Sequence, residues 1–217
     1  LKAASENDCE LLLASTSEIY GKNSSGPLNE NSDRIIGSPL KSRWSYSEAK
    51  AIDESLAYFY FTEKKLPIRI VRLFNTVGPR QVGNYGMVIP RFVKAAIHNQ
   101  PLLVYGNGNQ QRVFCHIQDA IDGILALWYS EFGTGEAFNL GGLEEISIKS
   151  LAERIIIQIK SSSKIEYIPY SKLTPGFEDI FRRVPDTSKL SSITGWKAKF
   201  NLDSILEDIV AEIRSLP

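Results

Sequence analysis

Short apolar runs alternate along the chain with longer segments in which apolar residues recur at helical spacing. The run Leu11–Ala14 is wholly apolar and predicts a strand buried on both faces, and Ile68–Phe74 predicts a second strand. In Ile148–Ile159, Ile and Leu recur as on one face of a helix. Because strands and helices alternate, the pattern indicates an α/β fold.

The same pattern predicts the remaining elements. Ser45 is expected to cap the helix that begins there, with Glu48 completing a capping box. After about Gly83 the elements are shorter and more mixed, as in a lobe at the carboxyl edge of the sheet. The further strands are expected at Leu102–Tyr105, Gln111–His116, Ala137–Leu140 and Ile165–Tyr170, and the helices at Ser45–Lys64, Met87–Asn99, Ile117–Ser130, Ser188–Thr194 and Leu202–Ser215.

Composition excludes several classes of function. The 217 residues carry a net charge of zero and no long basic run, which disfavours binding to nucleic acid or to a membrane surface. No apolar run reaches 18 residues, so no membrane span is expected. Cys9 and Cys115 form no disulfide framework, and His98 and His116 lie too far apart for a helical pair of metal ligands. We therefore expect no metal site and a reducing, cytoplasmic compartment.

A tyrosine and a lysine four residues apart are the most informative candidate for chemistry. On a helix Tyr46 and Lys50 share a face, so the ammonium is expected to lie beneath the phenol and favour its anion. Thr16 follows the strand at Leu11–Ala14 and could hydrogen-bond the same substrate oxygen. The spacing alone is weak, since Tyr60 and Lys64 repeat it in an aromatic stretch that we interpret as packing.

Several ordered motifs resemble one superfamily, the extended short-chain dehydrogenases/reductases. They are Ala14–Gly21 (ASTSEIYG), Tyr46–Lys50 (YSEAK) and Arg72–Arg80 (RLFNTVGPR). Within the superfamily they look like the nucleotide-sugar branch of 4-epimerases, 4,6-dehydratases and UDP-glucuronate decarboxylases. Further matches follow downstream at Gly86–Arg91, Pro101–Gly106, Gln111–Arg112, His116–Asp119 and Arg183–Asp186.

The resemblance implies the C-terminal part of a Rossmann-type parallel sheet with a smaller α/β substrate lobe. The glycine-rich turn that binds the dinucleotide pyrophosphate in this family is absent, and the chain is expected to lack roughly the first third of a family member. Residues 1–83 would be the remainder of the NAD-binding domain. Residues 84–217 would mainly form the nucleotide-sugar-binding lobe, with the chain crossing back to the sheet. A homodimer, built from two helices of each subunit, is implied as well.

The family also implies roles for the residues around the reacting sugar. Tyr46 matches the general base, and Lys50 the lysine that lowers its pKa and contacts the nicotinamide ribose of NAD. Phe74 is assigned to the cofactor as well, and Thr16 matches the hydroxyl that hydrogen-bonds the 4-oxygen of the sugar. The alternative for Tyr46 and Lys50 is a surface pair on an amphipathic helix.

Positions 17 and 18 favour one reaction within the branch. Dehydratases resemble Ser-Thr-Asp-Glu at this point, whereas this chain has Ser17, which cannot act as a comparable acid. The Ser-Thr-Ser-Glu sequence looks most like the decarboxylases, in which Glu18 and Arg183 would flank the carboxylated carbon. Arg183 could instead form a salt bridge with Glu178 or Asp179.

The remaining matches concern the nucleotide. Asn75 resembles a residue that hydrogen-bonds the glycosyl diphosphate, and the guanidinium of Arg112 resembles the diphosphate clamp. Asp119 is expected to be structural, and Arg80 could meet a negative substituent of the sugar. Leu103 and Tyr105 match the uracil site, and for Tyr105 plain core packing is the alternative. Val88 and Arg91 match the adjacent wall of the nucleotide site. Ser17 is assigned to substrate binding on the sugar side.

These assignments predict an enzyme that decarboxylates UDP-glucuronate to UDP-xylose through a 4-keto intermediate, with NAD as cofactor. A UDP-hexose 4-epimerase is the alternative within the branch. A non-catalytic nucleotide-sugar-binding remnant is the alternative of another class, motivated by the missing glycine-rich turn.

Overall fold

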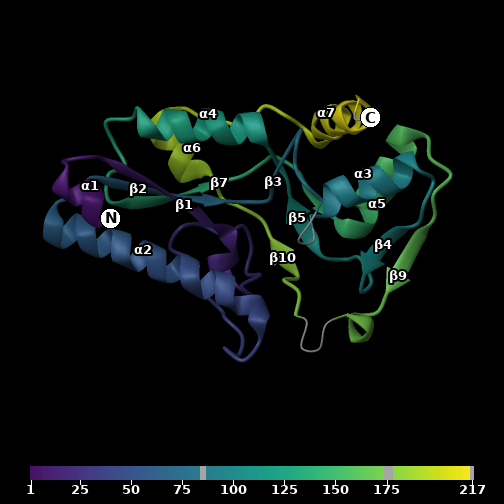
Figure 1. The fold of residues 1–217 in the computed structure, drawn as a ribbon, viewed down its shortest axis with the longest axis horizontal. Coiled ribbons are helices and arrows are strands. Elements are labelled where there is room, and N and C mark those ends of the chain that lie inside the picture. The colour runs from purple at the N-terminus through teal and green to yellow at the C-terminus, as the bar shows by residue number, and fades with distance from the viewer. Residues whose placement is uncertain (84–86, 174–177, 216–217) are drawn as a thin grey trace.

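The computed structural model describes residues 1–83, 87–173 and 178–215. It shows a three-stranded sheet with helices on both faces, and a smaller lobe beside the end of this sheet (Figure 1). The sheet has the order β1-β2-β7 and all its strands are parallel. Its strands are β1 (Leu11–Thr16), β2 (Ile68–Leu73) and β7 (Glu136–Leu140). Because the strands are parallel, Thr16 and Leu73 end at the same edge, which faces the lobe.

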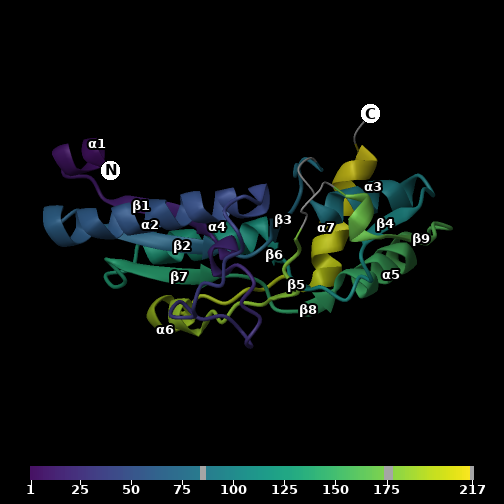
Figure 2. The same cartoon turned by 90° about the horizontal axis from the view of Figure 1, so that it is seen from below.

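Each face of the sheet is covered by its own pair of helices, which lie on opposite sides of the strands in Figure 1, where the sheet is seen nearly edge-on; Figure 2 shows the three strands side by side. Helices α1 (Lys2–Glu6) and α2 (Ser45–Lys64) pack on the face that carries Leu11 and Ile68. Helices α4 (Ile117–Trp128) and α6 (Ser188–Thr194) cover the other face, where Phe138 and Leu140 are fully buried. Side chains on a strand alternate between faces, so one short strand contributes to both cores.

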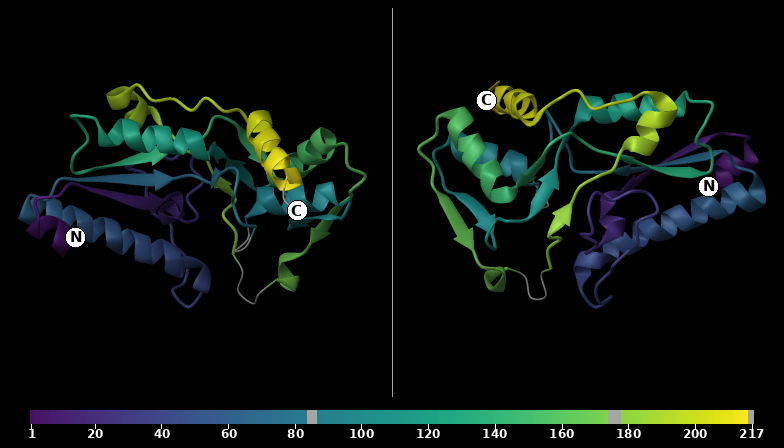
Figure 3. Two further views of the ribbon diagram at one scale, coloured as in Figure 1. Left: turned by 45° about the horizontal axis from the view of Figure 1, so that its top comes forward. Right: turned by 180° about the vertical axis from the view of Figure 1, so that it is seen from behind.

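The lobe has a separate apolar core beneath three helices. Helix α3 (Val88–Ile97) packs against α5 (Ile148–Ile159) and α7 (Leu202–Ser215), and α3 and α5 cover β4 (Leu102–Tyr105), which pairs in parallel with β9 (Ile165–Ile168). The buried side chains of Ile89, Leu102, Leu151 and Ile205 belong to this core. The lobe is therefore a second packed unit beside the sheet (Figure 3).

Short strands connect the two parts. One sheet has the order β10-β5-β8, and a two-stranded pair joins β3 to β6. Neither part is continuous in sequence, since the chain leaves the sheet after β2, returns to it as β7, and enters the lobe again at α5 (Figure 1). These linking elements are β3 (Thr76–Val77), β5 (Gln111–Val113), β6 (Cys115–His116), β8 (Glu145–Ser147) and β10 (Arg182–Arg183), with 3-10 helices η1 (Ser17–Tyr20), η2 (Ser42–Trp44) and η3 (Tyr170–Lys172).

The prediction of one continuous strand over Gln111–His116 is wrong. The segment breaks at Phe114 into β5 and β6, which have different partners, because β5 pairs with β8 and β6 pairs with β3. At the break the backbone of Gly142 passes so closely that a Cβ there would lie 1.9 Å from the carbonyl oxygen of Phe114. Only glycine fits this approach.

The predicted capping box at Ser45 is also wrong. Trp44, at the end of η2, occupies the N-cap position with near-helical backbone angles and no side-chain cap. The hydroxyl of Ser45 donates instead to the carbonyl of Ser42 at 2.8 Å, and Glu48 pairs with Arg34 at 3.1 Å. The predicted motif at Gly86–Arg91 begins outside the described residues.

In the part of the chain that the structure describes, no helix combines the length and the apolar character needed to cross a bilayer.

Candidate active site

A cavity of about 770 Å³ lies where the sheet, β10 and the lobe meet. It opens at the carboxyl ends of β1 and β2, the edge at which α/β folds bind ligands. Lining residues far apart in sequence include Thr16, Tyr46 and Arg183. The structure brings to this cavity the predicted residues Thr16, Ser17, Glu18, Tyr46, Asn75, Val88, Arg91, Leu103, Tyr105, Arg112 and Arg183.

Thr16 and Tyr46 place two hydroxyl groups at the sheet end of the cavity. Thr16 ends β1, and its oxygen accepts a hydrogen bond from the backbone N–H of Glu18 at 3.2 Å, which leaves its own proton to donate. Tyr46 stands in the first turn of α2 and is 53% exposed. A hydroxyl donor and a phenol on one wall can bind and deprotonate a sugar hydroxyl.

Lys50 lies one turn after Tyr46 on α2 and has two recorded partners. Its ammonium donates to the carbonyl of Ala14 at 3.1 Å and pairs with Asp53 at 3.3 Å, and the side chain is absent from the cavity lining. The i to i+4 spacing sets the helix face correctly, but the end of β1 supplies a backbone acceptor within reach. The effect of the Lys50 ammonium on the Tyr46 phenol therefore stays a prediction.

Phe74 has a fully buried side chain, packed beside Tyr20 with ring centroids 6.1 Å apart. It does not line the cavity, and its backbone N–H donates to Leu140 at 2.9 Å. A contact between its side chain and a cofactor is therefore excluded in this conformation, and only its backbone could make one. Ser17 does line the cavity, although it is almost completely buried.

Glu18 lies between two arginines. Arg183 on β10 donates to one oxygen of its carboxylate, and Arg43, just before α2, approaches the other oxygen at 2.6 Å. Burial alone would raise the pKa of Glu18, but the charges and hydrogen bonds of Arg183 and Arg43 outweigh burial and lower it. The carboxylate is therefore ionised in this state.

Arg183 is held from a second direction by Asn75, whose side-chain oxygen accepts from the guanidinium. Asn75 has φ +35°, in the left-handed region that asparagine tolerates better than most residues, and its amide N–H donates to Val113 at 2.8 Å. The expected alternative pairing of Arg183 with Glu178 or Asp179 is not what the structure records. Asn75 thus orients Arg183, in addition to the diphosphate contact predicted for it.

At the lobe end of the cavity Arg112 is paired with Asp179. The guanidinium donates to the Asp179 carboxylate at 2.9 Å, and the same carboxylate accepts from Gln110 and Tyr170. Burial and the nearby charge of Arg183 lower the pKa of Arg112 to about 10. Burial and Asp179 raise the pKa of Tyr170 to about 12. This polar cluster can present a guanidinium to a diphosphate.

An apolar and aromatic wall adjoins this cluster. Tyr105 lies half-buried with the guanidinium of Arg91 over its ring, 5.1 Å from the centroid. Leu103 is 39% exposed and lines the cavity beside Val88. Tyr105 is therefore wall rather than core, and the surface suits a flat heterocycle.

Two residues with roles in the site were missed from the sequence, Arg43 and Asp179. Arg43 lies three residues before Tyr46, and Asp179 four residues before Arg183. The sequence shows how near Arg43 is to Tyr46 and Asp179 to Arg183. It does not show their ion-pair partners, because Arg43 pairs with Glu18 and Asp179 with Arg112, which lie in distant segments. Arg80, in contrast, is exposed and outside the cavity lining, and the carboxylate of Asp119 accepts from the backbone of Lys199 and Phe200, as a structural residue does.

No group of three or more His, Cys, Asp or Glu residues in the described segments could hold a metal ion. The groups that line the cavity include hydroxyl groups, the ionised carboxylate of Glu18 and several guanidinium groups.

Comparison with known proteins identifies the family. The GDP-mannose 4,6 dehydratase family matches residues 1–209. A UDP-N-acetyl-alpha-D-glucosaminuronate decarboxylase of Bacillus cytotoxicus is 39% identical over 218 residues, covering 100% of this chain and 67% of the relative. UDP-glucuronic acid decarboxylase 1 of Danio rerio is 34% identical, covering 92% of the chain and 46% of the relative.

Solved structures of related enzymes share the fold of this chain. UDP-glucuronic acid 4-epimerase from Bacillus cereus, in complex with UDP-glucuronic acid and NAD, has a TM-score of 0.86 and 28% identity, covering 98% of this chain and 64% of that one. The chain thus spans between about half and two thirds of the length of these relatives. The α/β, Rossmann-type fold predicted from the sequence is confirmed. The chain belongs to the GDP-mannose 4,6 dehydratase family, among the nucleotide-sugar epimerases and dehydratases of the extended short-chain dehydrogenase/reductase type.

Proposed function

We propose that the protein containing this chain is an NAD-dependent decarboxylase that converts UDP-glucuronate to UDP-xylose and carbon dioxide. The observation that carries the proposal is the ionised Glu18 carboxylate, held by Arg183 beside Thr16 and Tyr46. Binding a sugar carboxylate calls for a guanidinium near the sugar in addition to those that bind the diphosphate. Arg183 lies by the sheet end of the cavity, whereas Arg112 is paired with Asp179 beside the lobe.

In this proposal Tyr46 takes the proton of the sugar 4-hydroxyl while Thr16 hydrogen-bonds its oxygen. Tyr46 and Lys50 fit the nicotinamide-ribose end of NAD, because the phenol faces the cavity and the ammonium lies near the end of β1. NAD, when bound, supplies the acceptor for the hydride of carbon 4 and returns that hydride at the end. Among the motifs of the sequence none fits the pyrophosphate end.

The decarboxylation step follows from the position of the new carbonyl. A ketone at carbon 4 is β to the carboxylate on carbon 5, so electrons of the breaking carbon–carbon bond pass into the carbonyl as carbon dioxide leaves. A proton then adds to carbon 5. Arg183 would orient the carboxylate, and Glu18 would assist the proton transfer; being ionised at the start, it would first act as an acceptor.

The nucleotide would bind at the lobe end. Arg112 would exchange its bond to Asp179 for the diphosphate, with Asn75 close by. The wall of Leu103, Tyr105 and Arg91 would hold the uracil ring.

A second substrate is favoured by one observation. The Bacillus cytotoxicus relative, at 39% identity, is named for a 2-acetamido uronate, which differs from glucuronate at carbon 2. The chemistry at carbons 4 and 5 is the same for both substrates. The 4-epimerase alternative explains Thr16 and Tyr46 but gives Glu18 no necessary proton to move.

We also propose a homodimer and a cytoplasmic location. Ile52, Leu56 and Phe59 leave about half of their surface exposed along one stripe of α2, the kind of face that pairs with another helix. Cys9 and Cys115 are both free thiols, as a reducing compartment requires. Light scattering of the complete protein tests the dimer, and a monomer at micromolar concentration contradicts it.

The experiment that tests the function is an assay of the complete protein with NAD and each of three nucleotide sugars. UDP-glucuronate and its 2-acetamido analogue are scored for carbon dioxide, and UDP-glucose for UDP-galactose. Carbon dioxide from either uronate supports the proposal and identifies the preferred one. Only UDP-galactose would support the epimerase, and no NAD binding at millimolar concentration would support a non-catalytic remnant.

A further inference from the structure

We infer that Arg43 is the second cation of a sugar-carboxylate site and selects nucleotide sugars that carry a carboxylate on the ring. The inference rests on the proposed function, which it extends from the reaction to the selection of the substrate. Arg43 was not a candidate from the sequence.

The first observation is an excess of positive charge. Arg183 donates to one oxygen of Glu18, and Arg43 lies 2.6 Å from the other, so one carboxylate faces two guanidinium groups. The side chains of Glu18, Arg43 and Arg183 keep only 16%, 26% and 10% of their surface exposed. Charges this far removed from water need partners, and the group retains one positive charge for an anion to neutralise.

The second observation is a free donor. The Nε–H of Arg183 is buried and has no hydrogen-bond partner among the described residues, and the residue is 8% exposed and lines the cavity. A buried guanidinium N–H without an acceptor is costly. An oxygen of a ligand in the cavity could satisfy it, and a carboxylate oxygen is the strongest acceptor available on a sugar.

The charges around the group do not cancel the excess. Arg112 adds another cation on the lobe side, but Asp179 is already bound to it. Thr16, toward the sheet, carries no charge, and Ser47 donates to the backbone carbonyl of Glu18 and not to its carboxylate. No further carboxylate lines the cavity in the described residues.

Without Arg43, Glu18 and Arg183 would form a neutral pair. A second carboxylate arriving next to Glu18 would then meet a like charge with no free cation, which disfavours its ionised form and its binding. Arg43 removes this penalty while it keeps Glu18 in place. The Trp44 ring beneath it, with the guanidinium 5.5 Å from the centroid, fixes its position. A neutral sugar gains nothing from this cation.

The test measures the ratio of two affinities by calorimetry, in the complete protein with NAD and with Tyr46→Phe to block turnover. The ligands are UDP-glucuronate and UDP-glucose, which differ only in the carboxylate at carbon 6. Arg43→Gln should lower the preference for UDP-glucuronate by about tenfold or more, the scale of one charged hydrogen bond, and should leave UDP-glucose affinity within about twofold. Arg182→Gln is the matched control, because Arg182 pairs with Glu145 outside the cavity, and it should change neither affinity.

Arg43→Met is a second uncharged variant, which keeps the apolar stem against Trp44 and decides the matter if Arg43→Gln fails to fold. An unchanged preference in the folded variants, or an equal loss for both ligands, overturns the inference. Carbon dioxide release by the unmutated protein is scored separately. Its absence overturns the decarboxylase proposal, whereas the preference for the carboxylated ligand and its dependence on Arg43 still decide the role of Arg43.

Discussion

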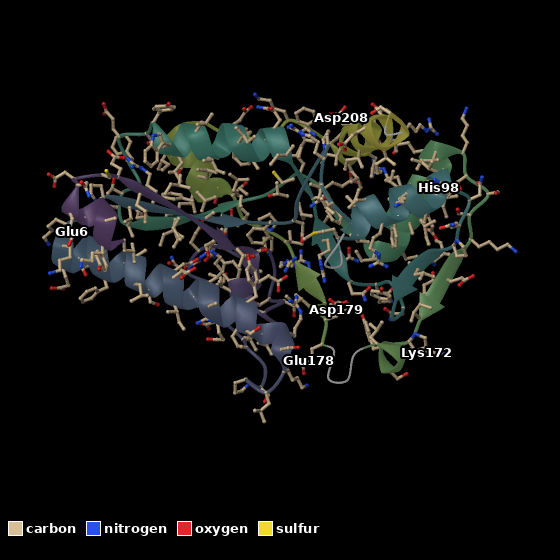
Figure 4. The ribbon with its side chains drawn as sticks, in the orientation of Figure 1. Glu6, His98, Lys172, Glu178, Asp179 and Asp208 are labelled. Carbon is tan, nitrogen blue, oxygen red and sulfur yellow. The ribbon has the colours of Figure 1, made fainter. Side chains whose placement is uncertain are left out.

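Trp44 donates its indole N–H to the carboxylate of Glu178 at 2.8 Å, although 134 positions separate the two residues. Lys22, at 3.0 Å, and Lys41 pair with the same carboxylate. The next residue, Asp179, pairs with Arg112 on the lobe side. Figure 4 labels Glu178 and Asp179 between α2 and the lobe. The Glu178–Asp179 pair therefore connects the segment before α2 to the lobe and sets the start of the strand that carries Arg183.

This link predicts a pH dependence of stability. Hydrogen bonds from Lys41, then from Lys22 and Trp44, lower the pKa of Glu178 to about 2 from an ordinary value of 4.5. Since the folded state has the lower pKa, the stabilisation is complete above the ordinary value and is lost as the pH falls toward 2. Glu178→Gln should therefore lower the melting temperature at pH 7, with a difference that shrinks between about pH 5 and pH 2.

The measurement is thermal unfolding at several pH values, with Glu6→Gln as an exposed control whose partner is Lys2. A difference between wild type and Glu178→Gln that stays constant down to pH 2 would show that the carboxylate charge does not hold this link.

A buried ion pair fixes α2 against the sheet. Glu54 accepts three hydrogen bonds from Arg72, of which the shortest is 2.7 Å, and the hydroxyl of Ser15 donates to it as well. The two side chains keep only 11% and 12% of their surface exposed. Glu54→Gln leaves the guanidinium without its counter-charge and should lower the free energy of unfolding by about 3 kcal/mol.

Chemical denaturation at pH 7 measures this change. Glu6→Gln, which removes an exposed pair, should cost less than about 1 kcal/mol in the same experiment. Equal small effects of both substitutions would mean that the Glu54–Arg72 pair does not anchor α2.

Tyr46→Phe tests the general base. The substitution should lower turnover by about 10²–10⁴-fold, the usual contribution of acid–base catalysis, and keep nucleotide-sugar affinity within about tenfold. Tyr60→Phe is the control, since Tyr60 packs in the core between α2 and the sheet. Near-normal turnover of Tyr46→Phe would remove Tyr46 from the mechanism.

Arg112→Ala tests where the diphosphate binds. Loss of the guanidinium should weaken UDP binding by about 1.5–3 kcal/mol in calorimetry, the scale of a charged hydrogen bond. Because Arg112 must first leave Asp179, the lower end of this range is expected. Unchanged affinity for UDP would place the diphosphate elsewhere.

Local patterns predicted much of the site, because they decide where strands end and where a helix begins. Thr16 follows an apolar strand and Tyr46 opens a periodic helix, so both had to reach the carboxyl edge of the sheet. The partner of Lys50 was not predictable, since the carbonyl of Ala14 depends on how α2 lies on β1. The inward orientation of the Phe74 side chain was not predictable, because a strand-end aromatic residue can face the core as readily as the ligand.

Residues joined across long separations escaped sequence analysis for a related reason. The strands β8 and β10 have two or three residues each and exist only because β5 lies between them. Arg43 acquires its role from Glu18, and Asp179 acquires its role from Arg112, only after the sheet and the lobe have come together.

Carbon dioxide release from UDP-glucuronate labelled at carbon 6, by the complete protein with NAD, tests the central claim most directly. The wild type should release label. Glu18→Gln should release it at a rate lower by about 10²-fold or more, while hydride transfer from carbon 4 survives in part. NADH should then accumulate on the variant and be visible by its near-ultraviolet absorbance. If neither protein releases label and both interconvert UDP-glucose and UDP-galactose at similar rates, the decarboxylase account is contradicted.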